Sequence, residues 1–333
     1  MERASKVLFA LILILTMVLW VNFLMEPVDR TSSTVIELKI EPGTSSSQIG
    51  QLLYNHQLIK SRFVFNTILK IRGLDQQLKA GYYALRPSAH LNRIIKQLVE
   101  GEVATFQITI PEGFTVEEIA KRLAELTAYT SEDFLSEARH NLFAKPYLRT
   151  EGIGNRYTVE GFLYPNTYII PKEYSPQQIL QVMLDEFEER WWERLKDETD
   201  RMSFTPYQIM IVASLIEAEA KLKEERPLIA AVIYRRLNNN MLLQLDASVQ
   251  YSLPARKSRV LYRDLDVESL YNTYRYPGLP PGPVCSPGDS SIEAALAPAE
   301  TDYLFYFARK DGSHVFSKTY QEHLRKQNEL REQ

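Results

Sequence analysis

The residue best suited to proton chemistry lies in the segment 209–221, which reads IMIVASLIEAEAK. The first eight residues of this segment are apolar or small, so a helix here is buried on nearly all sides. Glu217 follows the apolar run directly. A carboxyl group in such a place is partly desolvated, which suits it to general acid–base catalysis near neutral pH. The alternative is a surface ion pair between Glu217 and Lys221, one helical turn further on.

A second carboxyl group, Glu219, competes for the same role. It lies two residues after Glu217, about 200° around the helix axis, so the two side chains cannot face one cleft. Glu160 and Asp246 are further acidic residues that can assist the reaction or orient a substrate.

A proline-rich segment supplies candidate substrate contacts. Residues 271–288 read YNTYRYPGLPPGPVCSPG, with five prolines and three glycines, so the segment cannot form a regular element. A long ordered loop inside a compact domain is usually functional. Tyr271 and Tyr274 offer flat faces for sugar rings, while Gln244 and Asn272 can bond to hydroxyl or N-acetyl groups. The alternative for the tyrosines is ordinary packing beneath the loop.

Composition and motifs exclude several kinds of protein. The chain has 333 residues, enough for two or three domains, a net charge of −3 and no basic stripe, which argues against nucleic acid as a partner. The five histidines have no metal-ligand spacing among themselves or with the single cysteine, Cys285, so no metal site is expected. There is no P-loop, GxSxG or HExxH motif, and no cofactor is expected.

The N-terminal region predicts a membrane anchor. Residues 7–25 contain no charge and are long enough to span a hydrocarbon core of about 30 Å as a helix. Arg3 and Lys6 precede this run, while Glu26 and Asp29 follow it, so we expect a cytoplasmic N-terminus and a chain that is extracytoplasmic after residue 30. A cleaved signal peptide is the alternative. The run exceeds the usual h-region and no small-x-small site follows, which favours an uncleaved single-pass anchor in the cell (inner) membrane.

Strand and helix signals alternate along the rest of the chain and predict a mixed α+β fold. A strand at 36–40 precedes a helix with the capping box Ser45-x-x-Gln48, and a strand at 106–110 precedes a helix with the box Thr115-x-x-Glu118. This repeated strand–turn–helix unit loosely resembles LysM domains, which bind peptidoglycan-like glycans. Further expected elements are a helix that begins at Thr205-Pro206, a strand at 243–249, and a hairpin around 310–312.

Several segments in order resemble one family. ASLIEAEA (213–220), LQLDASVQY (243–251), the loop 271–288, VEGFLYPNTY (159–168) and the tail 294–317 are similar to the YceG-like endolytic murein transglycosylases. The resemblance covers nearly the whole chain and agrees with the predicted anchor. Leu245 and Ala247 stand where the family's LQTDPT pattern has Thr and Pro, whereas Gln244 and Asp246 match that pattern.

The resemblance implies cleavage of the MurNAc–β-1,4–GlcNAc bond inside peptidoglycan strands, leaving 1,6-anhydro-MurNAc ends. The family's catalytic glutamate carries over to Glu217. Hydrolytic glycosidases use two carboxyl groups, whereas here the C6 hydroxyl of the sugar replaces water. One glutamate can therefore act first as acid and then as base.

The expected organisation follows from these parts. We expect a cytoplasmic tail (1–6), a membrane helix (7–25), a linker (26–34), a LysM-like module (35–104) and a catalytic domain (105–333) that starts with the second repeat and a helical connector (105–158). The implied partners are peptidoglycan glycan strands, the membrane and peptidoglycan synthases, with action on nascent strands. The competing hypothesis is a non-catalytic glycan-binding or divisome scaffold protein.

Overall fold

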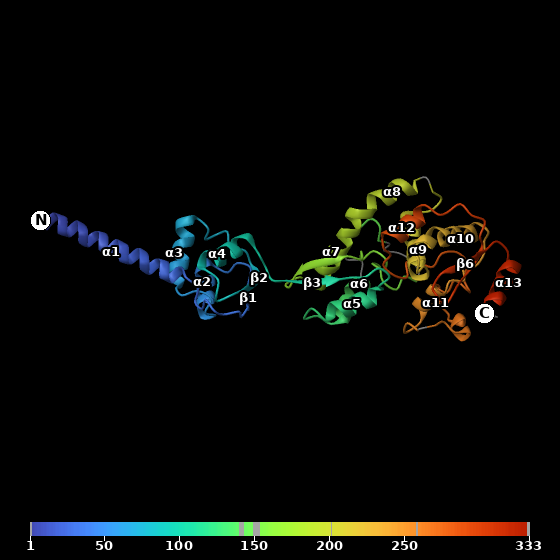
Figure 1. Ribbon diagram of the computed structural model, residues 1–333, viewed down its shortest axis with the longest axis horizontal. Coiled ribbons are helices and arrows are strands. Elements are labelled where there is room, and N and C mark those ends of the chain that lie inside the picture. Colours follow the sequence, from blue (N-terminus) through green and yellow to red (C-terminus); the bar gives the residue numbers. More distant parts are fainter. Residues whose placement is uncertain (1, 140–142, 149–153, 201, 258, 332–333) are drawn as a thin grey trace. The chain divides into compact units, whose positions relative to one another are not determined.

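A computed structural model describes residues 2–139, 143–148, 154–200, 202–257 and 259–331. The chain forms two compact units (Figure 1). Unit 1 contains Met1–Phe106 and Ile169–Glu173, and unit 2 contains Gln107–Tyr168 and Tyr174–Gln333. Both units combine helices with short strands, so the expected mixed α+β class is confirmed.

Unit 1 surrounds a small antiparallel sheet with helices. Its elements are α1 (Glu2–Met25), β1 (Ile36–Ile40), α2 (Ser46–Asn55), α3 (Arg62–Arg72), β2 (Gly81–Leu85) and α4 (Leu91–Glu100). β1 pairs with β2, with Leu38 opposite Tyr83. Both of these side chains are buried in one core with Phe65 of α3 and Ile94 of α4. The strand–helix–helix–strand order agrees with the expected small module, while its likeness to LysM domains stays a prediction.

Helix α1 is long and apolar enough to cross a membrane. Its segment Ser5–Met25 has a mean hydropathy of 2.7, and the apolar window within it is not buried. Only the C-terminal end of α1 contacts the rest of unit 1, because Val21, Leu24 and Met25 pack against the core. The segment that follows is held against unit 1 as well, since the Asp29 amide donates a hydrogen bond of 3.2 Å to the Pro87 carbonyl.

A two-stranded sheet carries the chain across the boundary between the units. It consists of β3 (Thr105–Thr109) and β4 (Thr167–Pro171). The chain enters unit 2 within β3, at Gln107, and the capping box at Thr115 begins the next helix as predicted. The capping box at Ser45 in unit 1 is also present. Both strand–turn–helix units of the sequence are therefore real elements.

Unit 2 is mostly helical. Its elements are α5 (Val116–Ala124), α6 (Ser131–Arg139), α7 (Pro176–Phe187), a π-helical turn (Glu188–Trp192), α8 (Glu193–Thr199), α9 (Pro206–Glu219), a 3-10 turn (Lys223–Glu225), α10 (Arg226–Asn238), α11 (Asp246–Ser252), a second 3-10 turn (Tyr262–Asp266), α12 (Asp289–Leu296), β5 (Phe305–Ala308), β6 (His314–Ser317) and α13 (Tyr320–Arg331). The predicted hairpin is confirmed, because β5 and β6 pair antiparallel with Phe305 opposite Ser317.

Helix α9 is the central element of unit 2. Every residue from Ile209 to Ile216 is buried, as expected for a helix that is apolar on all sides. It begins as predicted, with Thr205 as N-cap and Pro206 in the first turn. Helices α10, α11 and α12 pack against it. The helix ends at Glu219, because Ala220 is extended (φ −81°, ψ 121°).

The prediction of a strand at 243–249 is wrong. The chain is irregular up to Leu245, and helix α11 then begins at Asp246. Gln244 adopts a left-handed conformation (φ 54°), which interrupts any strand. Leu245 and Val249 are both buried and four residues apart, so they lie on one helix face. In such a short run the spacing of apolar residues does not distinguish a strand from a helix.

Candidate active site

The last turn of α9 carries two carboxyl groups with different surroundings. Glu217 and Glu219 both lie at the end where the buried part of the helix stops. Each has its own set of neighbours in unit 2. We refer to these sets as the Glu217 cluster (Glu217, Arg226, Gly288, Ser291 and Glu112) and the Glu219 cluster (Glu219, Gln244, Asp246, Tyr274 and Tyr306).

Glu217 is held in a buried ion pair. Arg226 Nη2, in the first turn of α10, lies 2.9 Å from Glu217 Oε1. The second oxygen, Oε2, accepts hydrogen bonds from the Gly288 amide (3.1 Å) and the Ser291 hydroxyl (2.9 Å) at the start of α12. The side chains of Glu217 and Arg226 are only 8% and 6% exposed. The ionic partner of Glu217 is thus Arg226, and not Lys221 as the alternative interpretation of the sequence had it.

The contacts of Glu217 suit a charged acceptor. Both oxygens receive donors, and one donor is a guanidinium group, so the hydrogen bond from Arg226 is charge-assisted and strong. Arg226 also donates to the Ser290 hydroxyl. The carboxylate thereby joins α9 to the first turns of α10 and α12. This is the geometry of a residue that holds three helices together.

Glu112, which was not among the residues predicted from the sequence, lies beside the ion pair. A Cβ atom at Gly288 would lie 2.1 Å from the carboxyl carbon of Glu112, so this position accommodates only glycine while Glu112 stays in place. Burial raises the pKa of Glu112, and the negative charge of Glu217 raises it further. The partners Arg226 and Ser291 were missed too, since no local spacing connects them to Glu217.

Glu219 has a different environment. It is half-buried, and its Oε1 accepts one hydrogen bond of 3.0 Å from the Ala247 amide in the first turn of α11. Burial raises the pKa of Glu219 to about 7, and the nearby charge of Asp246 contributes in the same direction. A carboxyl group with this pKa exists in both protonation states at neutral pH. That is the property a general acid–base catalyst requires.

Three residues that the sequence proposed as substrate contacts lie around Glu219. The Tyr274 hydroxyl donates a 2.7 Å hydrogen bond to Asp246 Oδ1, and burial together with this bond raises the pKa of Tyr274. Gln244 Oε1 accepts a hydrogen bond of 3.3 Å from Arg236 Nη1. Gln244 and Asp246 are themselves exposed, so their free polar atoms can reach a ligand.

Tyr306 of β5 completes this cluster. Its hydroxyl oxygen is buried and has no hydrogen-bond partner within the described part of the chain. Burial raises the pKa of this phenol, and the next largest cause is the charge of Glu219. A buried hydroxyl without a hydrogen-bond partner is costly, so this group needs an explanation at the site. Tyr306 was not predicted as a site residue, because the only sequence signal for it was its position in the tail 294–317 that resembles the family.

The other three predicted contacts are buried and bonded within the protein. Asn272 is fully buried and donates to the carbonyl groups of Leu265 (2.8 Å) and Val267 (2.9 Å). Tyr271 is 5% exposed and its ring packs against that of Tyr251.

Glu160 is 1% exposed and accepts hydrogen bonds from the Val116 amide (3.1 Å) and the Tyr251 hydroxyl (2.8 Å). Burial raises its pKa to about 8. In the structure Glu160, Tyr271 and Asn272 are thus buried, and each already contacts other residues of unit 2.

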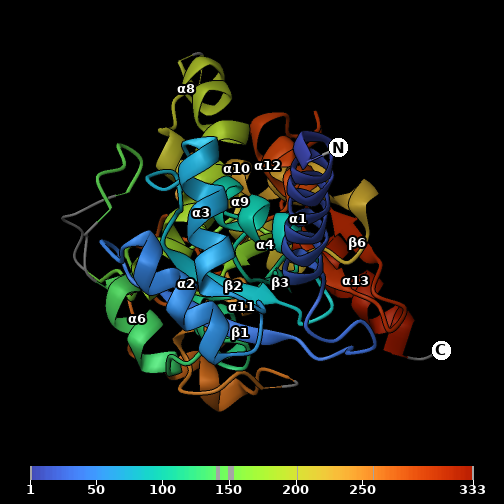
Figure 2. The ribbon, with the colours of Figure 1, turned by 90° about the vertical axis from the view of Figure 1, so that its left-hand side faces the viewer.

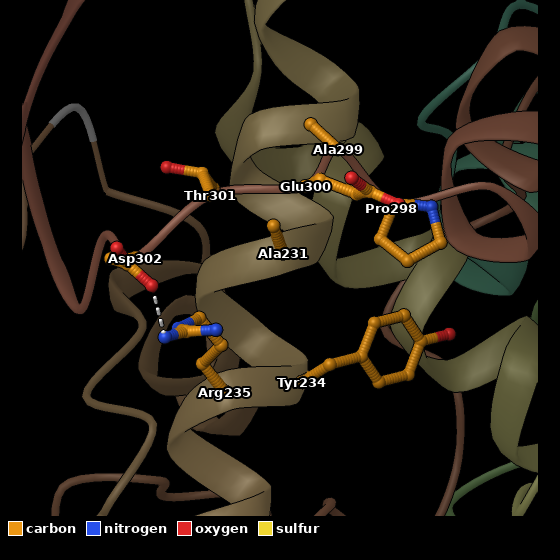
Figure 3. A pocket seen from close by; sticks show the side chains of 8 residues that line it. All are labelled: Ala231, Tyr234, Arg235, Pro298, Ala299, Glu300, Thr301 and Asp302. Atoms are coloured by element: carbon orange, nitrogen blue, oxygen red, sulfur yellow. Dashed lines mark hydrogen bonds and ion pairs between the residues drawn. The ribbon is translucent and has the colours of Figure 1, made fainter.

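A pocket of about 450 Å³ lies elsewhere in unit 2 (Figure 3). Its Arg235 and Asp302 already bond to each other at 2.6 Å. None of the residues proposed from the sequence lines it. The lining residues are Ala231, Tyr234, Arg235, Pro298, Ala299, Glu300, Thr301 and Asp302. The two carboxyl groups at the end of α9, Glu217 and Glu219, are therefore the candidates for the active site.

Comparisons with known proteins agree with the motifs. Residues 38–329 match the model of the YceG-like family. The chain is 36% identical over 311 residues to the endolytic murein transglycosylase of Bacillus subtilis, a match that covers 90% of this chain and 86% of the relative. It is 29% identical over 325 residues to the endolytic murein transglycosylase of Streptococcus pneumoniae, covering 89% of this chain and 58% of that longer relative.

A solved structure extends the similarity to the fold. The crystal structure of a YceG-like protein from Listeria monocytogenes matches 88% of this chain and 99% of its own chain. The TM-score is 0.63 and the sequence identity is 35%. The family model alone spans most of the sequence. The chain therefore belongs to the YceG-like family.

Proposed function

We propose that this protein is a membrane-anchored peptidoglycan lytic transglycosylase. It cleaves the MurNAc–β-1,4–GlcNAc bond within glycan strands and leaves 1,6-anhydro-MurNAc ends. The names of the relatives support the substrate class. The anchor, with its N-terminus in the cytoplasm, places both units on the extracytoplasmic side. There the enzyme would act on newly made strands close to the synthases and end their elongation.

We assign the acid–base role to Glu219 rather than to Glu217. The observation that carries this choice is the contact geometry of Glu219, which accepts one hydrogen bond from the Ala247 amide beside the exposed Asp246; burial raises its pKa to about 7. Both oxygens of Glu217 already accept hydrogen bonds, from Arg226, Gly288 and Ser291, whereas Glu219 accepts a single hydrogen bond, from the Ala247 amide. Glu217, the residue that the sequence favours, remains the alternative that experiment must exclude.

The reaction needs one carboxyl group in two successive roles. Protonated Glu219 donates its proton to the glycosidic oxygen, and the C1–O bond breaks with its electron pair on that oxygen, which becomes the 4-hydroxyl of GlcNAc. The resulting carboxylate then removes the proton from the C6 hydroxyl of MurNAc, whose oxygen forms the new bond to C1. No water is consumed, and Glu219 ends protonated as it began.

The neighbours of Glu219 support these steps. The negative charge of Asp246 disfavours the carboxylate form of Glu219, so the proton is retained until the substrate binds. The unpartnered hydroxyl of Tyr306 can donate to a sugar oxygen or to the carboxylate that forms in the first step. Gln244 and Tyr274 border the same site and can position hydroxyl or N-acetyl groups.

A matched pair of variants tests the assignment. Glu219→Gln should fold like the wild type and abolish cleavage, because glutamine cannot deliver a proton. Glu217→Gln should weaken folding, yet its remaining folded fraction should still cleave. If Glu217→Gln folds normally and is inactive while Glu219→Gln cleaves, the assignment passes to Glu217.

The product separates the proposed activity from its rivals. Full-length protein in detergent is incubated with purified peptidoglycan, and the fragments are analysed by mass spectrometry. New ends lighter by one water than hydrolytic ends would support the lytic transglycosylase. Reducing ends would make the enzyme a hydrolase, and Glu112 and Glu217 would become candidates for a second carboxyl group. Absence of any cleavage would favour the non-catalytic scaffold.

A further inference from the structure

Helix α3 of unit 1 has an exposed apolar side chain near each of its ends. Val64, Phe65 and Leu69 of this helix are buried in the core. Phe63 in its first turn is 75% exposed, and Ile71 in its last turn is 79% exposed. Both side chains are more exposed than any described apolar side chain of α1. Nothing in the described part of unit 1 covers them, although exposing large apolar groups to water is unfavourable.

The start of α3 is fixed to the end of α1. Lys60, just before the N-cap Ser61, donates a 3.3 Å hydrogen bond to the Phe23 carbonyl. Its ammonium group also lies 4.1 Å from the centre of the Phe23 ring. Since Phe23 belongs to the last turn of the apolar segment Ser5–Met25, α3 begins at the level where that segment would leave a bilayer.

The direction of α3 suits a membrane surface. Figure 1 shows α3 crosswise to α1 where α1 joins unit 1. In Figure 2, which turns the N-terminal side toward the viewer, α3 lies in front of β2 and α4. The face that carries α3 is therefore the one from which α1 departs. A helix crosswise to a membrane span lies along the bilayer plane, with its outer face toward the lipid.

The charge of this region selects a type of lipid. No Asp or Glu occurs between Pro42 and Leu74, although the chain contains 42 acidic residues in all. The same segment contains four basic residues, Lys60, Arg62, Lys70 and Arg72. Basic residues beside exposed apolar ones are typical of helices that lie on anionic membranes.

We propose that α3 lies in the interfacial layer of the bilayer that α1 spans. Phe63 and Ile71 enter the upper part of the acyl chains, while Lys60, Lys70 and Arg72 contact anionic phospholipid headgroups. The partner is the lipid surface itself, continuous with the membrane span. This contact fixes the height and tilt of unit 1, and it is independent of the reaction that unit 2 performs.

Spin labels at single cysteines measure the depth of the helix. Phe63→Cys, Ile71→Cys and the control Lys96→Cys on α4 are labelled in the full-length chain, where native Cys285 is buried. The proteins are placed in lipid nanodiscs that contain phosphatidylglycerol. We expect positions 63 and 71 to collide several-fold more with oxygen, relative to a water-soluble nickel chelate, than position 96. Equal ratios at all three positions would overturn the proposal.

Two comparisons test the role of charge. Moving the labelled Phe63→Cys protein into phosphatidylcholine discs should reduce the ratio, and Lys70→Gln with Arg72→Gln should reduce it in phosphatidylglycerol discs. A ratio that responds to neither change would refute the headgroup contacts. A glycan-binding role for this face is the competing outcome. In that case the labels would be shielded by added glycan strands and would remain accessible to the nickel chelate in every disc.

Discussion

The buried ion pair between Glu217 and Arg226 yields a quantitative prediction. Glu217→Gln keeps the size of the side chain but removes its charge, which leaves the buried guanidinium of Arg226 without its ion-pair partner. Breaking a buried pair by removing one partner costs about 3–5 kcal/mol. For a folding unit of this size the cost corresponds to a fall in Tm of roughly 6–20 °C.

A double-mutant cycle shows whether the two side chains stabilise through each other. Arg226→Met alone leaves Glu217 with only the Gly288 amide and the Ser291 hydroxyl as donors. The double variant contains no unpaired buried charge, so it should be more stable than the sum of the single effects by about 1–3 kcal/mol. Calorimetry of the full-length chain provides the Tm values.

The exposed pair Arg235–Asp302 is the matched control for this cycle. Its atoms are also close, at 2.6 Å, but the two side chains are 43% and 63% exposed. Asp302→Asn should therefore change stability by at most about 1 kcal/mol. The structural role of Glu217 is refuted if Glu217→Gln lowers stability no more than Asp302→Asn does. It is also refuted if the stability losses of Glu217→Gln and Arg226→Met simply add in the double variant.

Three further substitutions probe the Glu219 cluster and the buried carboxyl group Glu160. Asp246→Asn removes a charge that raises the pKa of Glu219, so the decline of kcat at alkaline pH should move to lower pH. An unchanged pH profile would show that Asp246 does not influence the reacting group. Tyr306→Phe should lower kcat roughly 10- to 100-fold with unchanged Tm, since one hydrogen bond to a charged or reacting group is lost; an equal fall in Tm would indicate packing instead. Glu160 has a pKa of about 8, so folded protein binds its proton more tightly than unfolded protein, and stability is lost as pH rises from about 4.5 to 8. Glu160→Gln should flatten that part of the Tm–pH curve, and a curve as steep as the wild type's would contradict this origin.

Local sequence signals predicted the elements of the site well. The apolar run 209–216 has no polar side, so it could only be the centre of a unit, and Thr205-Pro206 fixed its start. The hairpin at 310–312 and both capping boxes depend on contacts within a few residues. The helix α11 was missed because one left-handed residue, Gln244, separates the run into two short pieces.

Local sequence signals could not predict which residues surround each carboxyl group. Glu217 meets Arg226 only because a 3-10 turn at Lys223–Glu225 brings α10 back toward the end of α9. Its other donors, Gly288 and Ser291, come from about seventy residues further along the chain. Periodicity correctly placed Glu217 and Glu219 on different sides of α9, but it contains no information about which side holds an arginine.

The end of α9 illustrates why a motif with two acidic residues needs both. The last turn of an apolar helix that ends in the interior has little contact with water. Each carboxyl group there therefore needs hydrogen bonds or an ion pair within the protein. Glu217 forms these with a cation and two further donors, and so binds the neighbouring helices together. Glu219 receives one hydrogen bond from an amide and lies near the acidic Asp246, so its charge is less well compensated and its pKa is raised to about 7. The contacts of Glu217 thus fix the end of α9, on which Glu219 also lies, and the paired variants at 217 and 219 decide which carboxyl group reacts.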